Sequence, residues 1–235
     1  MTNIEHQYRK LITFLAPAEL ESAGVRVYPE KEMRNEQAVG GSEHFVQLFD
    51  SSKSLADSVA AFLIGGLERN ENVLIVATPE HRELLSRRLE QAGWNVHKLV
   101  AANRMMICDA VQTLDKFMRK DTPSPIAFDE VVGTVVQQLS NGKRLWIYGE
   151  MVDVLAARGN LRGAQQLEEM WNLLGQRECF TLFCGYASGH FGDPRAAKAL
   201  AGICAAHDCV HRKADDILAE FLLDQHDVKA VVEKS

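Results

Sequence analysis

Lys53 and Ser54 stand where a phosphate-binding loop could be, directly after an apolar run. They resemble the last two residues of the motif GxxxxGK[ST], but the segment here is FDSSKSLAD and has none of the glycines. Those glycines are needed because backbone N–H groups must converge closely on the phosphates. Asp50 would also place a negative charge beside them. We therefore do not expect ATP hydrolysis at this loop, and favour a helix-capping serine and a solvated lysine.

Glu80, His81 and Glu150 are residue types suited to proton transfer or to binding a polar group. Glu80 and His81 could act as an acid–base pair, but a glutamate in a first helical turn also complements the helix dipole. The dipole role is favoured for Glu80, and the role of His81 stays open. Glu150 follows an apolar run that ends at Gly149, so it could pair with Lys53, bind a ligand or cap a helix.

A denser group of metal-ligating residue types lies near the C-terminus, in the pattern C-x-x-H-x-C-x-H. On a helix, Cys204, His207 and His211 would share one face and could hold zinc, iron or haem, with Cys209 nearby. The spacing matches no established zinc pattern, and Cys204 also fits a helix core position. A packed helix is favoured over a metal site. No motif of a catalytic nucleophile is present, so no catalytic residue is assigned.

The elements that position these residues follow from the hydrophobic pattern. Short apolar runs typical of buried strands alternate with segments that have helical spacing of apolar residues. Helix caps are predicted at Thr78, Asp109 and Asn160, and a helix end at Asn141-Gly142. The alternation predicts an α/β fold with three layers, in which helices cover both faces of a mostly parallel sheet. The strand segments are 44–50, 73–77, 104–108, 145–148 and 180–186.

Parallel strands bring their carboxyl ends, where ligands bind in such sheets, to one edge. Polar residues that are far apart in the sequence are therefore expected on a common rim. We predict a small-molecule site on this rim. The rim residues are Asp50, Ser51, Ser52, Lys53, Ser54, Thr78, Glu80, His81, Asp109, Gly149, Glu150, Met151, Tyr186 and His190.

Composition narrows the class of protein. The 235 residues are 46% hydrophobic and 25% charged, which is typical of a globular protein. There are 32 acidic and 26 basic residues, and the net charge of −6 argues against non-specific nucleic-acid binding. Five cysteines without a CxxC pair indicate free thiols in a reducing cytoplasm. No apolar run approaches the ~20 residues of a membrane span, and the polar N-terminus predicts no signal peptide.

Three motifs together resemble the MEDS domain, a sensory domain of methanogens and methylotrophs. They are HF-x-x-L-F-D at 44–50, A-T-P-E-H-R at 77–82 and Y-G-E-M-V-x-x-L-x-x-x-G-N at 148–160, and the later ICAAHDCV extends the resemblance over about residues 43–211. The resemblance implies a KaiC/RecA-like fold that has lost its phosphate loop, and a sensor of small organic or hydrocarbon-derived ligands. The motif positions carried over are His44, Asp50, Glu80, His81, Gly149 and Glu150.

We therefore expect a non-enzymatic cytoplasmic sensor without a cofactor, which binds a small organic ligand at the carboxyl rim. The resemblance also implies an output module, since members of this family usually carry a DNA-binding helix-turn-helix or a histidine kinase. This chain shows neither, so the expected output is contact with a signalling partner protein or a second copy. One alternative is a nucleotide-binding protein or ATPase of RecA/KaiC ancestry. The other is a metal or haem sensor that uses Cys204, His207, Cys209 and His211.

Three regions are expected along the chain. We expect a short helix and a linker in residues 1–42, and the sensory domain in residues 43–195. Residues 196–235 are expected to form a helical extension. Within this extension, 214–225 carries an apolar stripe on an otherwise charged helix. Such a stripe packs either on its own domain or against another chain, and we favour a two-fold homodimer.

Overall fold

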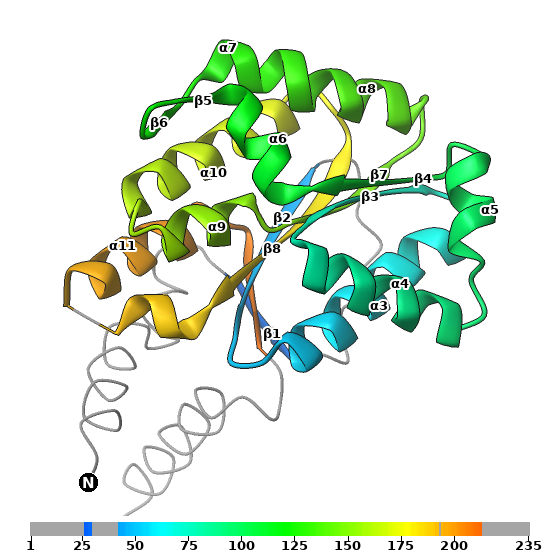
Figure 1. Ribbon diagram of the computed structural model, residues 1–235, viewed down its shortest axis with the longest axis horizontal. Helices are drawn as coiled ribbons and strands as arrows, with labels where there is room; N and C mark the ends of the chain where they lie inside the picture. The colour runs from blue at the N-terminus through cyan, green and yellow to red at the C-terminus, as the bar shows by residue number, and fades with distance from the viewer. Residues whose placement is uncertain (1–25, 30–41, 193, 213–235) are drawn as a thin grey trace, which may run out of the picture.

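The computed structural model describes residues 26–29, 42–192 and 194–212 (Figure 1). The central feature is one sheet of seven parallel strands in the order β1-β9-β2-β8-β7-β3-β4. The strands are β1 (Arg26–Pro29), β2 (Glu43–Phe49), β3 (Asn72–Ala77), β4 (Met105–Asp109), β7 (Leu145–Gly149), β8 (Phe180–Ala187) and β9 (Cys209–Arg212). A hairpin of two-residue strands, β5 (Met118–Arg119) and β6 (Thr122–Pro123), lies outside this sheet.

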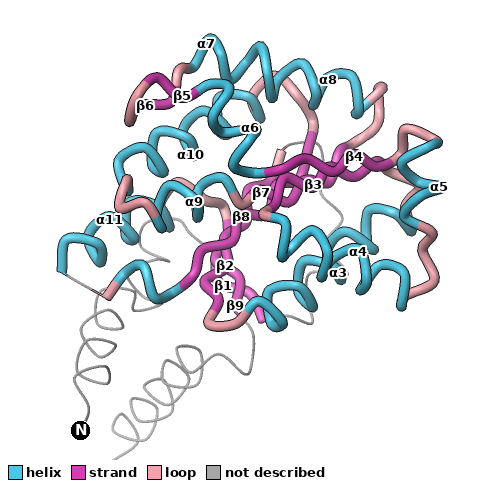
Figure 2. Tube along the Cα trace, viewed as in Figure 1, coloured by secondary structure: helices cyan, strands magenta, loops and turns pink. Residues whose placement is uncertain are grey.

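Helices cover both faces of the sheet, so the fold has the three predicted layers (Figures 1 and 2). One face is covered by α3 (Ser52–Glu68), α4 (Pro79–Gln91) and α5 (Val96–Ala101). The other is covered by α6 (Ala110–Phe117), α7 (Pro125–Phe128), α8 (Thr134–Ser140), α9 (Met151–Ala157), α10 (Leu161–Gly175) and α11 (Pro194–Ala205). Short helical turns complete the chain at η1 (Asp129–Gly133) and η2 (Ser188–Phe191).

The core is divided by the sheet because successive side chains of a strand point to opposite faces. In β3, Val73 and Ile75 belong to the cluster under α3, α4 and α5, whereas Leu74 and Val76 belong to the cluster on the other face. All six residues of β3 are buried. A strand that is covered on both faces has apolar residues at nearly every position, and this continuous apolar run is the signal that predicts β3 from the sequence.

The predicted strand segments and most local signals are confirmed. Asp109 caps α6 by accepting from the Gln112 N–H, and Asn160 caps α10 by accepting from the Gly163 N–H. Ser51 caps α3, as expected for a serine in a loop without phosphate-binding glycines. Thr78 occupies the cap position of α4 but makes no cap hydrogen bond, because its side chain is engaged elsewhere.

The structure differs from the prediction at both borders of the domain. The sequence predicts a linker at Arg26–Pro29 and a helical extension at Cys209–Arg212, but both are parallel strands that extend the sheet beyond β2. The helix ends at Ala205, so Cys204, His207 and His211 do not share a helical face. The chain turns here because Asp208 bonds the backbone of His44 on β2, through its own N–H and its carboxylate. The stripe predicted in 214–225 and the helix predicted before Pro17 lie outside the described residues.

Within the described ranges, no helix has the length and the apolar character that crossing a membrane requires.

Candidate functional site

Glu150 is the centre of a buried polar group at the carboxyl ends of β3 and β7. It follows the last residue of β7, and its backbone N–H donates to the Val76 carbonyl of β3. Its carboxylate, which is only 2% exposed, accepts from the Thr78 N–H (2.8 Å), the Thr78 hydroxyl (3.1 Å) and His81 Nδ1 (2.6 Å). Glu150 therefore pairs with Thr78 and His81 of the neighbouring loop rather than with Lys53.

His81 has one paired and one unpaired ring nitrogen. The ring is buried in the first turn of α4 and makes a T-shaped contact with Phe49. Nδ1 bonds Glu150, whereas Nε2 is buried and has no hydrogen-bond partner among the described residues. Burial alone would lower the pKa of His81, but the hydrogen bond and charge of Glu150 outweigh it and raise that pKa above its usual value. Since Nδ1 faces Glu150, a neutral ring would present a lone pair at Nε2 and a protonated ring would present an N–H there.

Asp153 and His190 join the loops after β7 and β8 to the same rim. The Asp153 carboxylate accepts from the Ala187 N–H at 2.8 Å and lies 3.2 Å from His190 Nε2. Burial raises the pKa of Asp153, although these two partners oppose the shift. Ser188 donates to Asp50, which connects the loop after β8 with the loop after β2. The rim thus brings together side chains from four loops, as the strand-end rule predicts.

Unpaired polar atoms also lie under α3 on the same face of the sheet. The Gln47 amide and the hydroxyls of Ser58 and Tyr148 are buried without a hydrogen-bond partner in the described part of the chain. Gly185 is the register partner of Gln47, and a Cβ there would lie 3.2 Å from the Tyr148 hydroxyl. Each buried group without a hydrogen-bond partner costs about 1–3 kcal/mol, and an ordered water or a ligand would remove that cost.

The other predicted rim residues have different surroundings. Lys53 and Glu80 are exposed, and Ser52 and Ser54 are half-buried at the start of α3. Asp109 caps α6 and also pairs with Arg82 at 2.9 Å. Gly149, Met151 and Tyr186 are buried. The Tyr186 hydroxyl points to Glu168 on α10, so it belongs to a second polar group, on the opposite face of the sheet.

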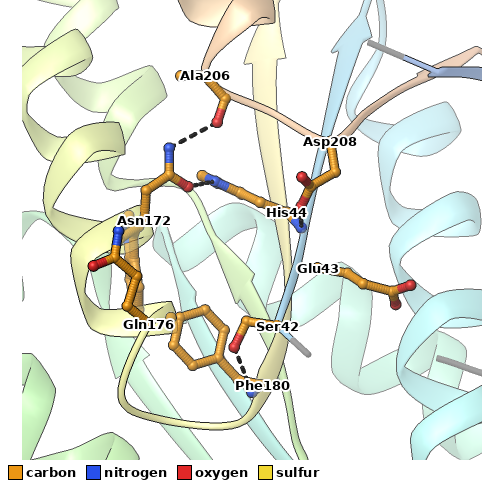
Figure 3. Close-up of a pocket in the computed structure, with 10 residues that line it drawn as sticks. Ser42, Glu43, His44, Asn172, Gln176, Phe180, Ala206 and Asp208 are labelled. Atoms are coloured by element: carbon orange, nitrogen blue, oxygen red, sulfur yellow. Dashed lines mark hydrogen bonds between the residues drawn. The ribbon is translucent and has the colours of Figure 1, made fainter. Parts of the chain in front are cut away.

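Two cavities in the described part of the molecule lie at the amino ends of the strands, on the edge opposite the rim. One, of about 260 Å³, opens where β2 and β8 begin (Figure 3). Its wall includes His44, Asn172, Phe180 and Asp208. The other, of about 510 Å³, lies before β3, β4 and β7 and is lined by residues that include Asn72 and Arg104.

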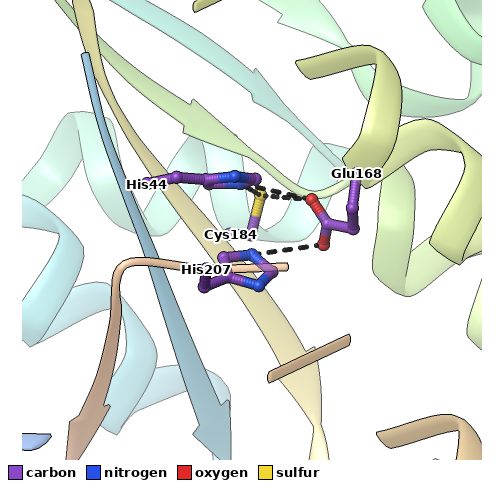
Figure 4. A group of neighbouring side chains, drawn as sticks. All are labelled: His44, Glu168, Cys184 and His207. Atoms are coloured by element: carbon purple, nitrogen blue, oxygen red, sulfur yellow. Dashed lines mark hydrogen bonds and ion pairs between the residues drawn. The ribbon is translucent and has the colours of Figure 1, made fainter. Parts of the chain in front are cut away.

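The second polar group is fully buried on the α10 side of the sheet (Figure 4). It consists of His44 from β2, Glu168 from α10, Cys184 from β8 and His207 from the bend after α11. His44 Nε2 lies 3.2 Å from Glu168 Oε2 and 3.2 Å from Cys184 Sγ. Cys184 Sγ lies 3.5 Å from Glu168 Oε2, and His207 Nε2 lies 3.4 Å from Glu168 Oε1. One potential ligand atom of each residue thus lies within 4.8 Å of all the others.

The charges of this group are tightly coupled. Burial opposes ionisation of Glu168, but His207 and His44 outweigh it and hold the pKa of the carboxyl well below its usual range. Burial and the neighbouring His207 lower the pKa of His44. Burial and the Glu168 charge raise the pKa of the Cys184 thiol well above its usual value. In the absence of another cation, the group is a carboxylate beside a protonated thiol.

Sequence reasoning named His44 and His207 but missed Glu168 and Cys184 as partners. Glu168 did leave a signal, since it lies on the apolar stripe of α10 between Ala164 and Trp171. A charged residue on a buried stripe needs a partner. The identity of that partner could not be predicted, because His44 is more than 120 residues away in the sequence.

The His81–Glu150 pair predicts a pH dependence of stability. Because the folded-state pKa of His81 is raised, the stability that the pair contributes is fully present below the unfolded-state pKa of about 6.5. It is lost as the pH rises through the folded-state pKa. The difference in free energy of unfolding between the protein and His81→Gln should therefore shrink on going from pH 6 to higher pH, in urea titrations. His97→Gln, at an exposed position on α5, is the matched control. A difference that grows with pH would contradict the assignment.

Comparison with known proteins places the chain in a family. Among solved structures, it is similar to a KaiC-like protein from the hyperthermophilic archaeon Pyrococcus horikoshii OT3, with 22% identity and a TM-score of 0.42. The alignment covers 64% of this chain and spans 64% of the archaeal protein. The search of curated proteins gave no match. The profile of the MEDS family (MEthanogen/methylotroph, DcmR Sensory domain) matches residues 43–208, which include the whole rim and the buried group. This chain is therefore a member of the MEDS family of sensory domains.

Proposed function

We propose that this protein is a non-enzymatic sensor that binds a small organic molecule at the carboxyl ends of β3, β7 and β8. One observation carries the proposal: the buried His81–Glu150 pair holds a ring whose Nε2 has no hydrogen-bond partner among the described residues. A ligand acceptor at this nitrogen would satisfy the group, and Glu150 would keep the ring charged and oriented.

The surroundings of His81 indicate the chemical class of the ligand. The His81 ring lies against Phe49, and this side of the sheet has an apolar core that includes Leu55 and Phe183. Polar atoms that could fix a ligand are few, namely His81 Nε2, the Tyr148 hydroxyl and the Gln47 amide. Sites of this kind favour a small molecule with an apolar body and one or two polar or polarisable atoms. A short alcohol or a halogenated one-carbon compound fits this description.

Signalling requires that the ligand prefer one of two conformations of the domain. His81 lies in the first turn of α4 and is hydrogen-bonded to Glu150 at the start of α9, so a ligand that moves the His81 ring would act on helices from both faces of the sheet. We propose that a change in these helix starts is passed to a partner protein or to a second copy of the chain. The apolar stripe that the sequence predicts in 214–225 is the proposed contact.

The test is NMR of the full chain with labelled histidines, titrated separately with dichloromethane, methanol and 1-propanol. Saturable shifts of the His81 ring signals are expected with at least one of these compounds. The apparent Kd should rise at least tenfold in Glu150→Gln, since a tenfold change corresponds to loss of one charge-assisted contact of about 1.4 kcal/mol. Lys53→Ala should also alter the response, although its free energy of unfolding should change by less than about 0.5 kcal/mol.

Two controls separate this function from its alternatives. His97→Gln should leave the titration unchanged, because His97 is exposed on α5 at the other edge of the sheet. Labelled ATP, with and without magnesium, should not bind tightly. Magnesium-dependent ATP binding with turnover would replace the sensor proposal with the nucleotide alternative. Shifts that appear equally at His97 and His81 would mean that the compounds act as solvents only.

A further inference from the structure

The buried group of His44, Glu168, Cys184 and His207 lies on the face of the sheet opposite His81, so its role is separate from the proposed ligand site. We propose that these four side chains bind one divalent transition-metal ion, and that the ion is zinc. The four residues come from β2, α10, β8 and the bend after α11, so the ion would connect four elements of the fold.

The donor set and its spacing fit a tetrahedral ion. Two imidazole nitrogens, a thiolate and a carboxylate are all ligands that zinc takes in proteins. With metal–ligand bonds of about 2.1 Å, neighbouring ligand atoms of a tetrahedron lie about 3.4 Å apart. The three separations among His44 Nε2, Glu168 Oε2 and Cys184 Sγ are 3.2, 3.2 and 3.5 Å. His207 Nε2 lies 3.4 Å from the other carboxylate oxygen, and one ligand atom of each residue lies within 4.8 Å of the others. Three ligand atoms thus have the separations that a bound ion requires, and the fourth lies within reach.

The hydrogen bonds around the group orient both imidazoles for binding a metal. His207 Nδ1 lies 2.6 Å from the Ile203 carbonyl, which can only accept, so this nitrogen carries the proton. His44 Nδ1 lies 2.8 Å from Asn172 Oδ1, and the amide is held in this orientation because its Nδ2 donates to the Ala206 carbonyl. In neutral rings the Nε2 lone pairs then face the centre. Histidines that bind a metal through one ring nitrogen usually donate the N–H of the other ring nitrogen to an oxygen, as both rings do here.

The carboxylate of Glu168 is also held by a hydrogen bond from outside the group, since the Tyr186 hydroxyl donates to Glu168 Oε1 at 2.7 Å. This bond leaves Oε2, which lies nearest to His44 Nε2 and Cys184 Sγ, as the free oxygen of the carboxylate. A carboxylate that is held by an outer donor and directs its other oxygen inward is again what a metal ligand needs.

Protons alone satisfy the group poorly. A proton on His207 Nε2 could bridge to Glu168, and the thiol could donate to His44, but His44 Nε2 and Glu168 Oε2 would still face each other as two acceptors at 3.2 Å. Protonating both rings would place two cations side by side, since their centroids are 3.9 Å apart. His207 Nε2 lies 3.4 Å from Glu168 Oε1 but has no hydrogen bond of good geometry within the described residues. One metal cation would replace these mismatched contacts with four bonds.

Charge balance favours a divalent ion. Two neutral imidazoles, one thiolate and one carboxylate carry two negative charges, so an ion of charge +2 gives a neutral site. A neutral site is what a buried position favours, because an uncompensated charge there is strongly penalised. Binding would release the thiol proton of Cys184 to solvent. All four positions of the tetrahedron are filled by protein, which is the pattern of a structural rather than a catalytic zinc.

The cavity at the amino end of β2 provides a route to the site. His44 belongs both to the buried group and to the cavity wall, where Asn172 and Asp208 lie beside it (Figure 3). Displacing the His44–Asn172 pair would open the group to the cavity. The Asp208 carboxylate at the cavity wall would attract a cation to this end of the sheet.

The test uses the untagged full chain from cells grown with added zinc, and measures metal content by mass spectrometry. About one zinc per chain is expected, with X-ray absorption that shows one sulfur and three nitrogen or oxygen neighbours. After removal of zinc by a chelator, added Co²⁺ should give a thiolate charge-transfer band and ligand-field bands of tetrahedral intensity. Wild-type protein that takes up less than about a tenth of an equivalent of either ion would overturn the proposal.

Variants then assign the ligands. Cys184→Ser should remove the charge-transfer band, and Glu168→Gln and His207→Gln should lower the metal content at least tenfold. Cys108→Ser on β4 and His211→Gln on β9 are the matched controls and should keep both ion and spectrum. Metal retained in Cys184→Ser but lost in His211→Gln would place the ion elsewhere. If a ligand variant does not fold, the sulfur count and cobalt spectrum of the wild-type protein still decide the outcome.

Discussion

Replacing Glu150 with alanine is expected to lower the free energy of unfolding by about 3–5 kcal/mol, because it leaves a buried pair without one partner. The Thr78 N–H and hydroxyl and His81 Nδ1 all lose their acceptor at once. From the sequence alone, Glu150 is expected on an exposed rim, where substitution changes stability by less than about 0.5 kcal/mol. Its burial reverses that expectation.

Urea titration of three variants measures this effect. Ile75→Ala, which opens a cavity in a fully buried strand, should cost about 2–5 kcal/mol and serves as the benchmark. Lys53→Ala, at an exposed rim position, should cost less than about 0.5 kcal/mol. If Glu150→Ala is as mild as Lys53→Ala, the buried pair does not anchor the rim. Glu150→Gln keeps an acceptor oxygen for the Thr78 N–H and should cost less than Glu150→Ala; an equal cost would show that the charge of Glu150, rather than its hydrogen bonds, holds the rim together.

Replacing Trp171 with alanine is expected to lower the free energy of unfolding by about 3–5 kcal/mol, because the neighbouring side chains cannot fill the cavity. Trp171 is 1% exposed on α10 and packs edge-on against Phe128 (5.3 Å between ring centroids) and Phe180 (5.9 Å). These rings come from α7 and β8, so the substitution removes contacts of α10 with a neighbouring helix and with the sheet at the same time.

Leu173→Ala is the matched control for this measurement. Leu173 lies on the same helix but is 60% exposed, so its truncation should change stability by less than about 0.5 kcal/mol. Both variants should be unfolded in urea with a chelator present, because an ion bound only to the folded protein would add to the apparent stability. A cost below about 1 kcal/mol for Trp171→Ala would show that the core re-packs around the missing ring.

The sequence determined the features that depend on local periodicity. A continuous apolar run predicted β3, because a strand covered on both faces has no exposed side. Asp109 and Asn160 predicted their helix starts, because a cap needs only a side chain three residues from an N–H. The motifs at 44–50, 77–82 and 148–160 predicted the family that the profile comparison confirms.

Tertiary structure decided which of these residues meet. The strand-end rule could place Thr78, His81 and Glu150 on one rim, but only the pairing of β3 with β7 buries the glutamate against the histidine. The bend after α11 could not be predicted either, since the local spacing of Cys204 and His207 favours a helix. It forms because Asp208 bonds the backbone of β2. The four buried side chains follow no regular spacing in the sequence, because His44, Glu168, Cys184 and His207 come from four separate parts of the fold. Only the packing of these parts on one face of the sheet brings the four side chains within reach of a single ion.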